Sequence, residues 1–253
     1  MKHLEIYESW FSKFKRNRKL KKSLSSEQIA AIDAICKVYS IINYTINEDG
    51  SIDVNSVVSL DYCELNRMPL KFNNINGGFS CTHNRLTSLE NGPVNVQGSY
   101  NCSSNSLTSL EGMPKYVSSD FICSFNPLLD NFNGIQEGEN RVEGEFTCHG
   151  TPINNIYRYF RKFDKIGLFN EYDILRPNRE LVLERFQQFL RDIGEDEVSM
   201  TRAKTFNEYW IIDPEQFENM PMWTGKDISS APATHSIIPR KVRLPNIEGY
   251  KSI

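Results

Sequence analysis

A 21-residue repeat constrains the fold of this chain more strongly than any other feature of its sequence. Residues 77–97 read GGFSCTHNRLTSLENGPVNVQ, and residues 98–118 read GSYNCSSNSLTSLEGMPKYVS. Degenerate copies begin at Ser119 and Gly144, and the segment that begins at Val57 fits the same frame. Such a period predicts a solenoid of about five coils, in which each coil buries its apolar side only by stacking on its neighbours.

Each coil is expected to contain one short strand, because an aromatic residue and a cysteine alternate with a period of two. Strands that recur once per coil lie parallel on one wall, about 4.8 Å apart. The residues expected to point inward from this wall are Phe79 and Cys81, Tyr100 and Cys102, Phe121 and Cys123, and Phe146 and Cys148. Those expected to face them from the opposite wall are Leu86, Leu89, Leu107 and Leu110.

An asparagine follows each of three strands, at Asn84, Asn105 and Asn126. We expect these side chains to hydrogen-bond backbone groups of adjacent coils, which a buried turn otherwise leaves unpaired. Pro93 and Pro114 prevent an α-helix on the return wall. The return segments are therefore expected to be extended or to form single turns.

The block N-x-L-T-S-L-E with its preceding F-x-C resembles leucine-rich repeats of the short bacterial type. It is similar, more narrowly, to repeat proteins encoded by large T4-like tailed bacteriophages, over a region from about residue 42 to Ile193. The resemblance implies an α/β fold: a short leucine-rich-repeat-like solenoid of about five coils, with helical caps at both ends. Coil three, with LLDNF, and coil four, with Thr151, depart from the motif, so the array is expected to end there.

The N-terminal region, residues 1–41, is predicted to hold two helices joined by a basic linker. The first places Leu4, Tyr7, Phe11 and Phe14 on one face, and the second begins at a capping box formed by Ser25 and Gln28. Residues 42–152 are predicted to form a hairpin over 43–54 followed by the solenoid.

Residues 153–198 are predicted to form a C-terminal helical cap. One helix carries Ile153, Ile156, Tyr157, Phe160 and Phe163 at helical spacing. A second helix begins at the N-cap Asn178, ends at Gly194, and has an apolar face made of Val182, Phe186, Phe189, Leu190 and Ile193. Residues 199–253 are predicted to be an extended tail, because Pro214, Pro221, Pro232, Pro239 and Pro245 interrupt it.

Catalysis and metal binding have little support in the residues. Four of the six cysteines, Cys81, Cys102, Cys123 and Cys148, follow the repeat. Zinc sites need closely spaced pairs such as C-x-x-C, so reduced, buried thiols are expected rather than a metal site. No G-x-S-x-G, P-loop or H-E-x-x-H motif is present. We therefore expect no enzyme activity, no metal and no cofactor.

Composition bears on location and on charged partners. The net charge of −3 gives no general attraction to nucleic acid or to an anionic membrane, and no apolar run is long enough to span a bilayer. Glu5 and Glu8 interrupt the apolar run that a signal peptide needs, which predicts a cytoplasmic location. If the chain is phage-encoded, that cytoplasm is the host cell's, or the chain belongs to the virion.

One basic segment could bind nucleic acid or another acidic partner. It occupies residues 13–22 and contains Lys13, Lys15, Arg16, Arg18, Lys19, Lys21 and Lys22. More often such a run is a solvated linker between helices.

The outward side of the strand wall is the strongest candidate for a binding site. The residues predicted to contact a partner are Asp61, Tyr62, Ser80, Thr82, His83, Asn101, Ser103, Ile122, Phe125, Thr147 and His149. Aromatic groups on a small, polar, rigid wall are typical of a protein-binding face. The sequence thus favours non-enzymatic protein recognition, for example by a phage factor that acts on a host protein. A structural virion component is the alternative.

Overall fold

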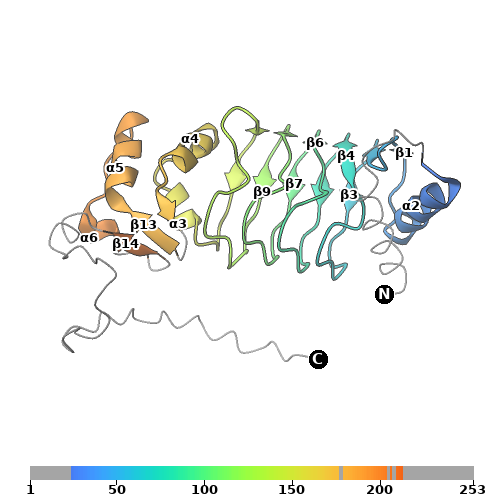
Figure 1. Ribbon diagram of the computed structural model, residues 1–253, viewed down its shortest axis with the longest axis horizontal. Coiled ribbons are helices and arrows are strands. Elements are labelled where there is room, and N and C mark those ends of the chain that lie inside the picture. The colour runs from blue at the N-terminus through green and yellow to red at the C-terminus, as the bar shows by residue number, and fades with distance from the viewer. Residues whose placement is uncertain (1–23, 177–178, 204–205, 207–208, 213–253) are drawn as a thin grey trace, which may run out of the picture. The chain divides into compact units, whose positions relative to one another are not determined.

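The computed structural model describes residues 24–176, 179–203, 206 and 209–212 (Figure 1). The chain divides into two compact units, Met1–Tyr172 and Asp173–Ile253. The sequence predicts boundaries after residues 41, 152 and 198, whereas the structure keeps the described residues up to Tyr172 in the same unit as the solenoid. None of the described helices is long and apolar enough to cross a membrane.

The described part of the first unit begins with the helix α2 (Ser26–Val38). The predicted capping box is present, since the Ser25 hydroxyl accepts from the backbone N–H of Gln28 and the Gln28 side chain accepts from that of Ser25. The helix buries Ile32, Ile35 and Cys36. The predicted hairpin follows, with β1 (Tyr44–Ile46) antiparallel to β2 (Ile52–Val54). The predicted helix around Leu4 to Phe14 lies outside the described residues.

The predicted solenoid of about five coils is confirmed. Its predicted strand wall is a parallel sheet in the order β11-β9-β7-β5-β3. The strands are β3 (Val58–Ser59), β5 (Phe79–Ser80), β7 (Tyr100–Asn101), β9 (Phe121–Ile122) and β11 (Phe146–Thr147). Each aromatic or valine residue of the repeat is paired in register with its equivalent in the next coil.

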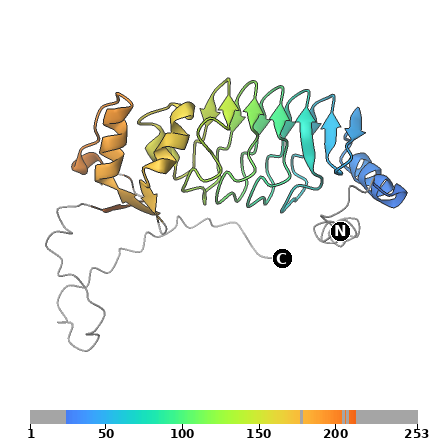
Figure 2. The ribbon, with the colours of Figure 1, turned by 45° about the horizontal axis from the view of Figure 1, so that its top comes forward.

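A second sheet, which the sequence did not predict, forms another wall of the same coils. It has the order β1-β2-β4-β6-β8-β10, and Figure 2 shows its strands side by side in a row. The strands after the hairpin are β4 (Phe72–Ile75), β6 (Asn95–Val96), β8 (Tyr116–Val117) and β10 (Arg141–Val142). Each coil therefore contains two short strands, and each strand of the second sheet ends a few residues before the next strand of the β3–β11 sheet begins.

The interior of the solenoid is a set of aligned columns. Four aromatic rings stack through consecutive coils, with 5.2 Å between the centroids of Phe79 and Tyr100, 5.2 Å between Tyr100 and Phe121, and 5.8 Å between Phe121 and Phe146. The four cysteines of the repeat are free and buried in a parallel column, as predicted. The four leucines expected on the opposite wall, Leu86, Leu89, Leu107 and Leu110, are fully buried.

The asparagine column joins the coils as predicted. Asn105 donates through Nδ2 to the carbonyl oxygens of Cys81 and Cys102, at 2.9 and 3.1 Å, and its Oδ1 accepts from the backbone N–H of Leu86 at 3.0 Å. Asn126 repeats this set of bonds one coil later. Each side chain thus satisfies buried backbone groups in its own coil and in the preceding one.

Two short helices and a 3₁₀ turn replace the single helix that the sequence predicts after coil four. They are α3 (Asn154–Tyr157), η1 (Phe163–Lys165) and α4 (Ile166–Glu171). The interruption lies at Arg161, whose φ of 44° is left-handed and cannot continue an α-helix. Four apolar residues of the predicted helix, Ile153, Ile156, Tyr157 and Phe160, are nevertheless buried, and the rings of Tyr157 and Phe160 pack on Phe132. Phe163 is partly buried.

The second unit contains a three-stranded sheet and the helices α5 (Leu183–Asp192) and α6 (Met200–Ala203). Its strands are β12 (Leu175–Arg176), β13 (Glu180–Val182) and β14 (Trp210–Ile212), in the order β12-β13-β14. The helix predicted between Asn178 and Gly194 corresponds to α5, which begins at Leu183, directly after β13. Its predicted N-cap, Asn178, lies outside the described residues. The prediction of an extended tail from residue 199 is wrong for its first part, since α6 and β14 lie there and β14 pairs with β13; residues 213–253 are not described.

Candidate binding face of the solenoid

Three columns of side chains cover the outer side of the β3–β11 sheet. The strand column consists of Ser59, Ser80, Asn101, Ile122 and Thr147, which pair in register. The second column, two residues further along each coil, consists of Asp61, Thr82, Ser103, Ser124 and His149. The third, which we call the corner column, consists of Tyr62, His83, Ser104, Phe125 and Gly150.

The residues of the corner column share an unusual backbone conformation. Their φ angles lie between 53° and 69°, in the left-handed region. The N–H groups also hold the column in place: that of His83 donates to Ser103 O at 3.1 Å, and that of Phe125 to His149 O at 2.7 Å. The left-handed region favours glycine and asparagine, and bulky residues seldom occupy it. The conformation of the turn therefore does not explain why tyrosine, histidine and phenylalanine occupy these positions.

The aromatic side chains of the corner column face solvent. Tyr62 is 71% exposed and Phe125 is 63% exposed, although both residues are large and apolar. The rings of Tyr62 and His83 stack at 4.3 Å with an interplanar angle of 16°. A Cβ atom at Gly150 would lie 2.8 Å from Cδ1 of Phe125, so this glycine leaves room for the ring. The column thus presents ordered aromatic groups on a rigid backbone.

Asp61 is a predicted contact residue, but its carboxylate accepts hydrogen bonds from the neighbouring coil. Its Oδ1 accepts from the Ser80 hydroxyl at 2.5 Å, and from the backbone N–H and the hydroxyl of Thr82 at 2.7 and 2.8 Å. Partial burial raises the pKa of Asp61, but these hydrogen bonds outweigh burial and hold the pKa below its ordinary value. The carboxylate therefore ties the first coil to the second.

The remaining predicted contacts differ in accessibility. Ser103 is buried, because the neighbouring coils cover its small side chain, so its inclusion in the accessible face is corrected. His83 and His149 are exposed, and the others are partly buried: Ser80, Thr82, Asn101, Ile122 and Thr147. The basic residues Lys13, Lys15, Arg16, Arg18, Lys19, Lys21 and Lys22 lie outside the described residues.

The buried thiols offer no nucleophile. Burial raises the pKa of Cys81 to about 12 and raises that of Cys102 well above its ordinary value. Since the thiolate is the reactive form, both groups are inert at neutral pH. Within the described ranges, no cluster of three His, Cys, Asp or Glu side chains could hold a metal ion.

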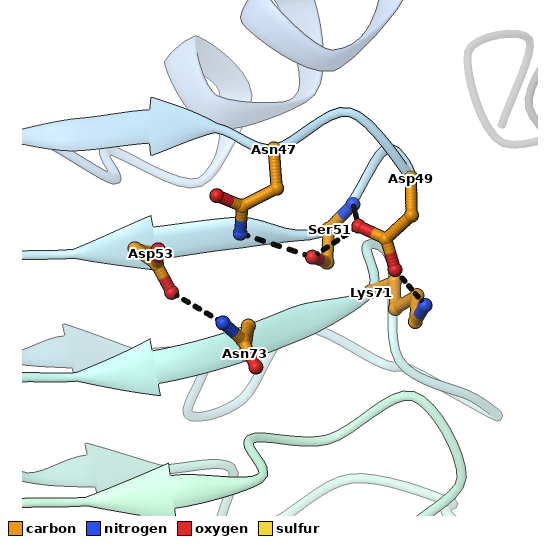
Figure 3. A network of polar contacts seen from close by, with 6 residues as sticks. All are labelled: Asn47, Asp49, Ser51, Asp53, Lys71 and Asn73. Atoms are coloured by element: carbon orange, nitrogen blue, oxygen red, sulfur yellow. Dashed lines mark hydrogen bonds and ion pairs between the residues drawn. The ribbon is translucent and has the colours of Figure 1, made fainter. Parts of the chain in front are cut away.

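A polar network near the hairpin is also internally satisfied (Figure 3). Asp49 forms an ion pair with Lys71 and accepts from the backbone N–H and the hydroxyl of Ser51, at 3.0 and 2.6 Å. Burial raises the pKa of Asp49, but the bonds from Lys71 and Ser51 outweigh it and bring the pKa to about 2. Asp53 accepts from Nδ2 of Asn73 at 2.8 Å. These groups join the hairpin to the next coil and leave the corner column as the better candidate site.

A cavity of about 500 Å³, which the sequence does not predict, lies at the last coil. Its lining residues are Gly144, Glu145, Phe146, Thr147, Cys148, His149, Asn154, Tyr157, Arg158, Arg161 and Phe163. The departure of coil four from the repeat is the signal that marks this place, because the stack of coils has no further member to cover it.

Comparisons of the chain with protein-family models, with curated proteins and with solved structures found no match. The function of the chain is therefore inferred from the geometry of the solenoid.

Proposed function

We propose that the chain is a non-enzymatic recognition protein that binds a protein partner through the outer face of the β3–β11 sheet. Tyr62, His83 and Phe125 are the central contacts, and the small residue Ser104 lies between His83 and Phe125 in the same column. Ser80, Asn101, Thr147 and His149 form the polar surround of this face, together with the apolar Ile122.

One observation carries the proposal. Large aromatic side chains occupy left-handed positions that turn chemistry reserves for glycine or asparagine, and two of them are more than 60% exposed. Neither packing of the core nor formation of the turn accounts for them. Rigid exposed aromatic groups lose little conformational entropy on binding, which is why such groups dominate the energetics of many protein interfaces.

The finer assignments belong to the same proposal. The chain is a leucine-rich-repeat-like protein of the kind that T4-like phages encode, and its partner is a host protein in the host cytoplasm. The repeat block N-x-L-T-S-L-E supports this origin. Three features support recognition over catalysis: the inert thiols, the internally paired Asp61, and a binding face without a paired acid and base.

The test compares two variants by quantitative mass spectrometry after pull-down from infected cells. The double variant Tyr62→Ala/Phe125→Ala is expected to lose the partner about tenfold or more, since two aromatic contacts are worth about 1–2 kcal/mol each. The control is Val38→Ala, which removes an equally exposed apolar group (60%) from α2.

Both variants are expected to keep the melting temperature of the parent protein, because exposed residues contribute little to stability. The proposal fails if the double variant retains the same proteins as the control. It also fails if the double variant unfolds, since the side chains would then belong to the core.

A further inference from the structure

The cavity of about 500 Å³ at the last coil is large enough for a small organic molecule. Its volume falls in the range of about 300–1,000 Å³ that is usual for ligand pockets. A water molecule takes about 30 Å³ in the liquid, so an inorganic ion would fill only a small part of the cavity. One part of the lining comes from residues 144–149, and the other comes from Asn154, Tyr157, Arg158, Arg161 and Phe163.

Aromatic rings supply the apolar part of this lining. The ring of Phe146 packs on Tyr157 with 5.0 Å between centroids and on Phe163 with 5.4 Å. Phe146 and Tyr157 are 7% and 8% exposed, whereas Phe163 is only partly buried. The three rings therefore hold one another in place, and Phe163 presents most of the ring surface that a ligand would touch.

Asn154 adds an amide donor to the lining. The Cys148 thiol donates to Asn154 Oδ1, with 3.8 Å between Sγ and Oδ1, so the amide oxygen is the atom on the side of the thiol. The amide nitrogen, Nδ2, donates to no acceptor in the part of the chain that the structure describes. A partly buried amide N–H is thus available to a ligand in the cavity.

The charged groups of the lining favour an anion. They are two arginines, Arg158 and Arg161, and one carboxylate, that of Glu145. The Arg158 guanidinium lies over the Tyr159 ring, 5.2 Å from its centroid. Arg161 is exposed and forms no ion pair with a described residue, and its φ of 44° is left-handed. Since long side chains seldom occupy that region, the turn does not explain why an arginine stands there.

We propose that this cavity binds an organic anion, an aromatic body that carries a carboxylate or a phosphoryl group. The anionic oxygens pair with the Arg161 guanidinium and accept from Asn154 Nδ2, and the aromatic body lies against Phe163. A guanidinium presents paired N–H donors that match the oxygens of both head groups. The cavity adjoins the proposed binding face, with which it shares Thr147 and His149, but it does not depend on the function proposed for that face.

The experiment uses full-length ¹⁵N-labelled protein and follows amide chemical shifts by NMR. The probes are benzoate and phenyl phosphate, with benzamide as the uncharged control, benzylamine as the cationic control and inorganic phosphate as the control without a body. We expect both anions to shift the amides of His149, Asn154 and Arg161 with a Kd of about 10 mM or below, as is usual for ligands of this size. The three controls should bind at least about tenfold more weakly, and the tighter anion identifies the head group.

Substitutions separate the contributions of the two polar side chains. Arg161→Gln is expected to weaken binding of the anions about fivefold, as for loss of an exposed ion pair. Asn154→Asp keeps an acceptor for the Cys148 thiol but places a carboxylate beside the anion, so a loss of about tenfold or more is expected. The control is Arg141→Gln, because Arg141 is an exposed arginine of β10 that pairs with Glu143 at 2.7 Å.

Tyr62→Ala distinguishes this proposal from the proposed function. Tyr62 follows β3, at the other end of the sheet, so this variant is expected to bind the anions as the parent protein does. Loss of anion binding in Tyr62→Ala would assign the anions to the corner column and overturn the proposal.

Further results would overturn the proposal. Benzamide or benzylamine that bound as well as benzoate would show that charge does not select the ligand, and inorganic phosphate that bound as well as phenyl phosphate would exclude the aromatic body. The absence of shifts at about 10 mM anion would mean that the cavity is no ligand site or that another segment of the chain fills it. An unchanged Kd in Arg161→Gln would also contradict the proposal, and this exposed position decides the test if Asn154→Asp does not fold.

Discussion

The inner and outer sides of the β3–β11 sheet follow different rules, although the same strands supply both. Inward, the repeat varies little: Phe or Tyr alternates with Cys, and all these side chains stack on their equivalents in the next coil. Outward, the corner column changes at every step, from Tyr62 to His83, Ser104, Phe125 and Gly150. Stacking demands that neighbours match on the inside, whereas nothing in the coil demands it on the outside.

The difference between the inner and outer sides distinguishes two kinds of position in the repeat. A position that recurs in every coil reports on how the coils pack, and a position that varies is free for recognition. Asp61 lies between the two kinds, since it is on the outer side but bonds to Ser80 and Thr82 in the next coil. The contrast between the two sides can be measured by substitution.

The largest effect is expected from an inner position. Leu107→Ala removes a fully buried side chain and is expected to lower the free energy of unfolding by about 2–5 kcal/mol. Leu128→Ala is the matched control, since Leu128 is 45% exposed in the following coil, and its effect should stay below about 0.5 kcal/mol. Urea unfolding followed by circular dichroism measures both. Equal losses would mean that the inner and outer sides do not differ as described.

A buried polar position is expected to rank next. Asn105→Ala removes the acceptor of the Leu86 N–H and the donor to the carbonyls of Cys81 and Cys102. These groups stay buried, so the expected loss is about 2–4 kcal/mol. Ser104→Ala, at the adjacent corner position, is expected to change the free energy of unfolding by less than about 0.5 kcal/mol. If Asn105→Ala unfolded no more easily than Ser104→Ala, the asparagine column would not join the coils.

The inner columns could be predicted because each position recurs. Residues 77–97 and 98–118 show that the repeat has a period of 21 residues. This period alone places Phe79 next to Tyr100, and Asn84 next to Asn105, in neighbouring coils. The outward positions of Ser80 and Thr82 follow from the same alternation. Those of Tyr62, His83 and Phe125 do not, because each lies four residues after an inward residue and is turned outward by its left-handed backbone. These parts of the fold and of the candidate site are therefore properties of one coil, repeated.

The features that the sequence did not predict depend on contacts beyond one coil. The second sheet consists of strands such as β6 and β8, in each of which one residue is buried, so that no inward pair such as Phe79 and Cys81 marks these strands in the sequence. The break at Arg161 follows from a left-handed residue inside an otherwise helical pattern, which spacing does not reveal. Burial of Ser103 depends on how closely neighbouring coils approach.

A smaller effect is expected at the outer position that bonds across coils. Asp61→Ala leaves the Thr82 N–H and the hydroxyls of Ser59, Ser80 and Thr82 without their acceptor, at an expected cost of about 1–3 kcal/mol at pH 7. Because the folded pKa of Asp61 lies below the unfolded value of about 3.9, this stabilisation is present above pH 4 and is lost as pH falls through the folded pKa.

The gap between the parent protein and Asp61→Ala should accordingly narrow from pH 7 to pH 3 in urea unfolding. Glu111→Gln, which removes an exposed carboxylate, is the control and should change stability little at either pH. A gap that stays constant with pH would show that the charge of Asp61 does not contribute.

The smallest effect is expected at Tyr100, the inner residue that has a hydroxyl where the neighbouring coils have phenylalanine. The Tyr100 hydroxyl is buried and is the one side-chain oxygen or nitrogen of the described residues that is buried without a hydrogen-bond partner. Its neighbours Phe79 and Phe121 occupy equivalent positions without a hydroxyl, so Tyr100→Phe keeps the stack and removes an unpaired polar group. We expect the free energy of unfolding to rise by up to about 1 kcal/mol, because burial of an unpaired hydroxyl is unfavourable. The reverse change, Phe121→Tyr, should lower it, and a clear loss of stability in Tyr100→Phe would show that the hydroxyl has a partner in solution.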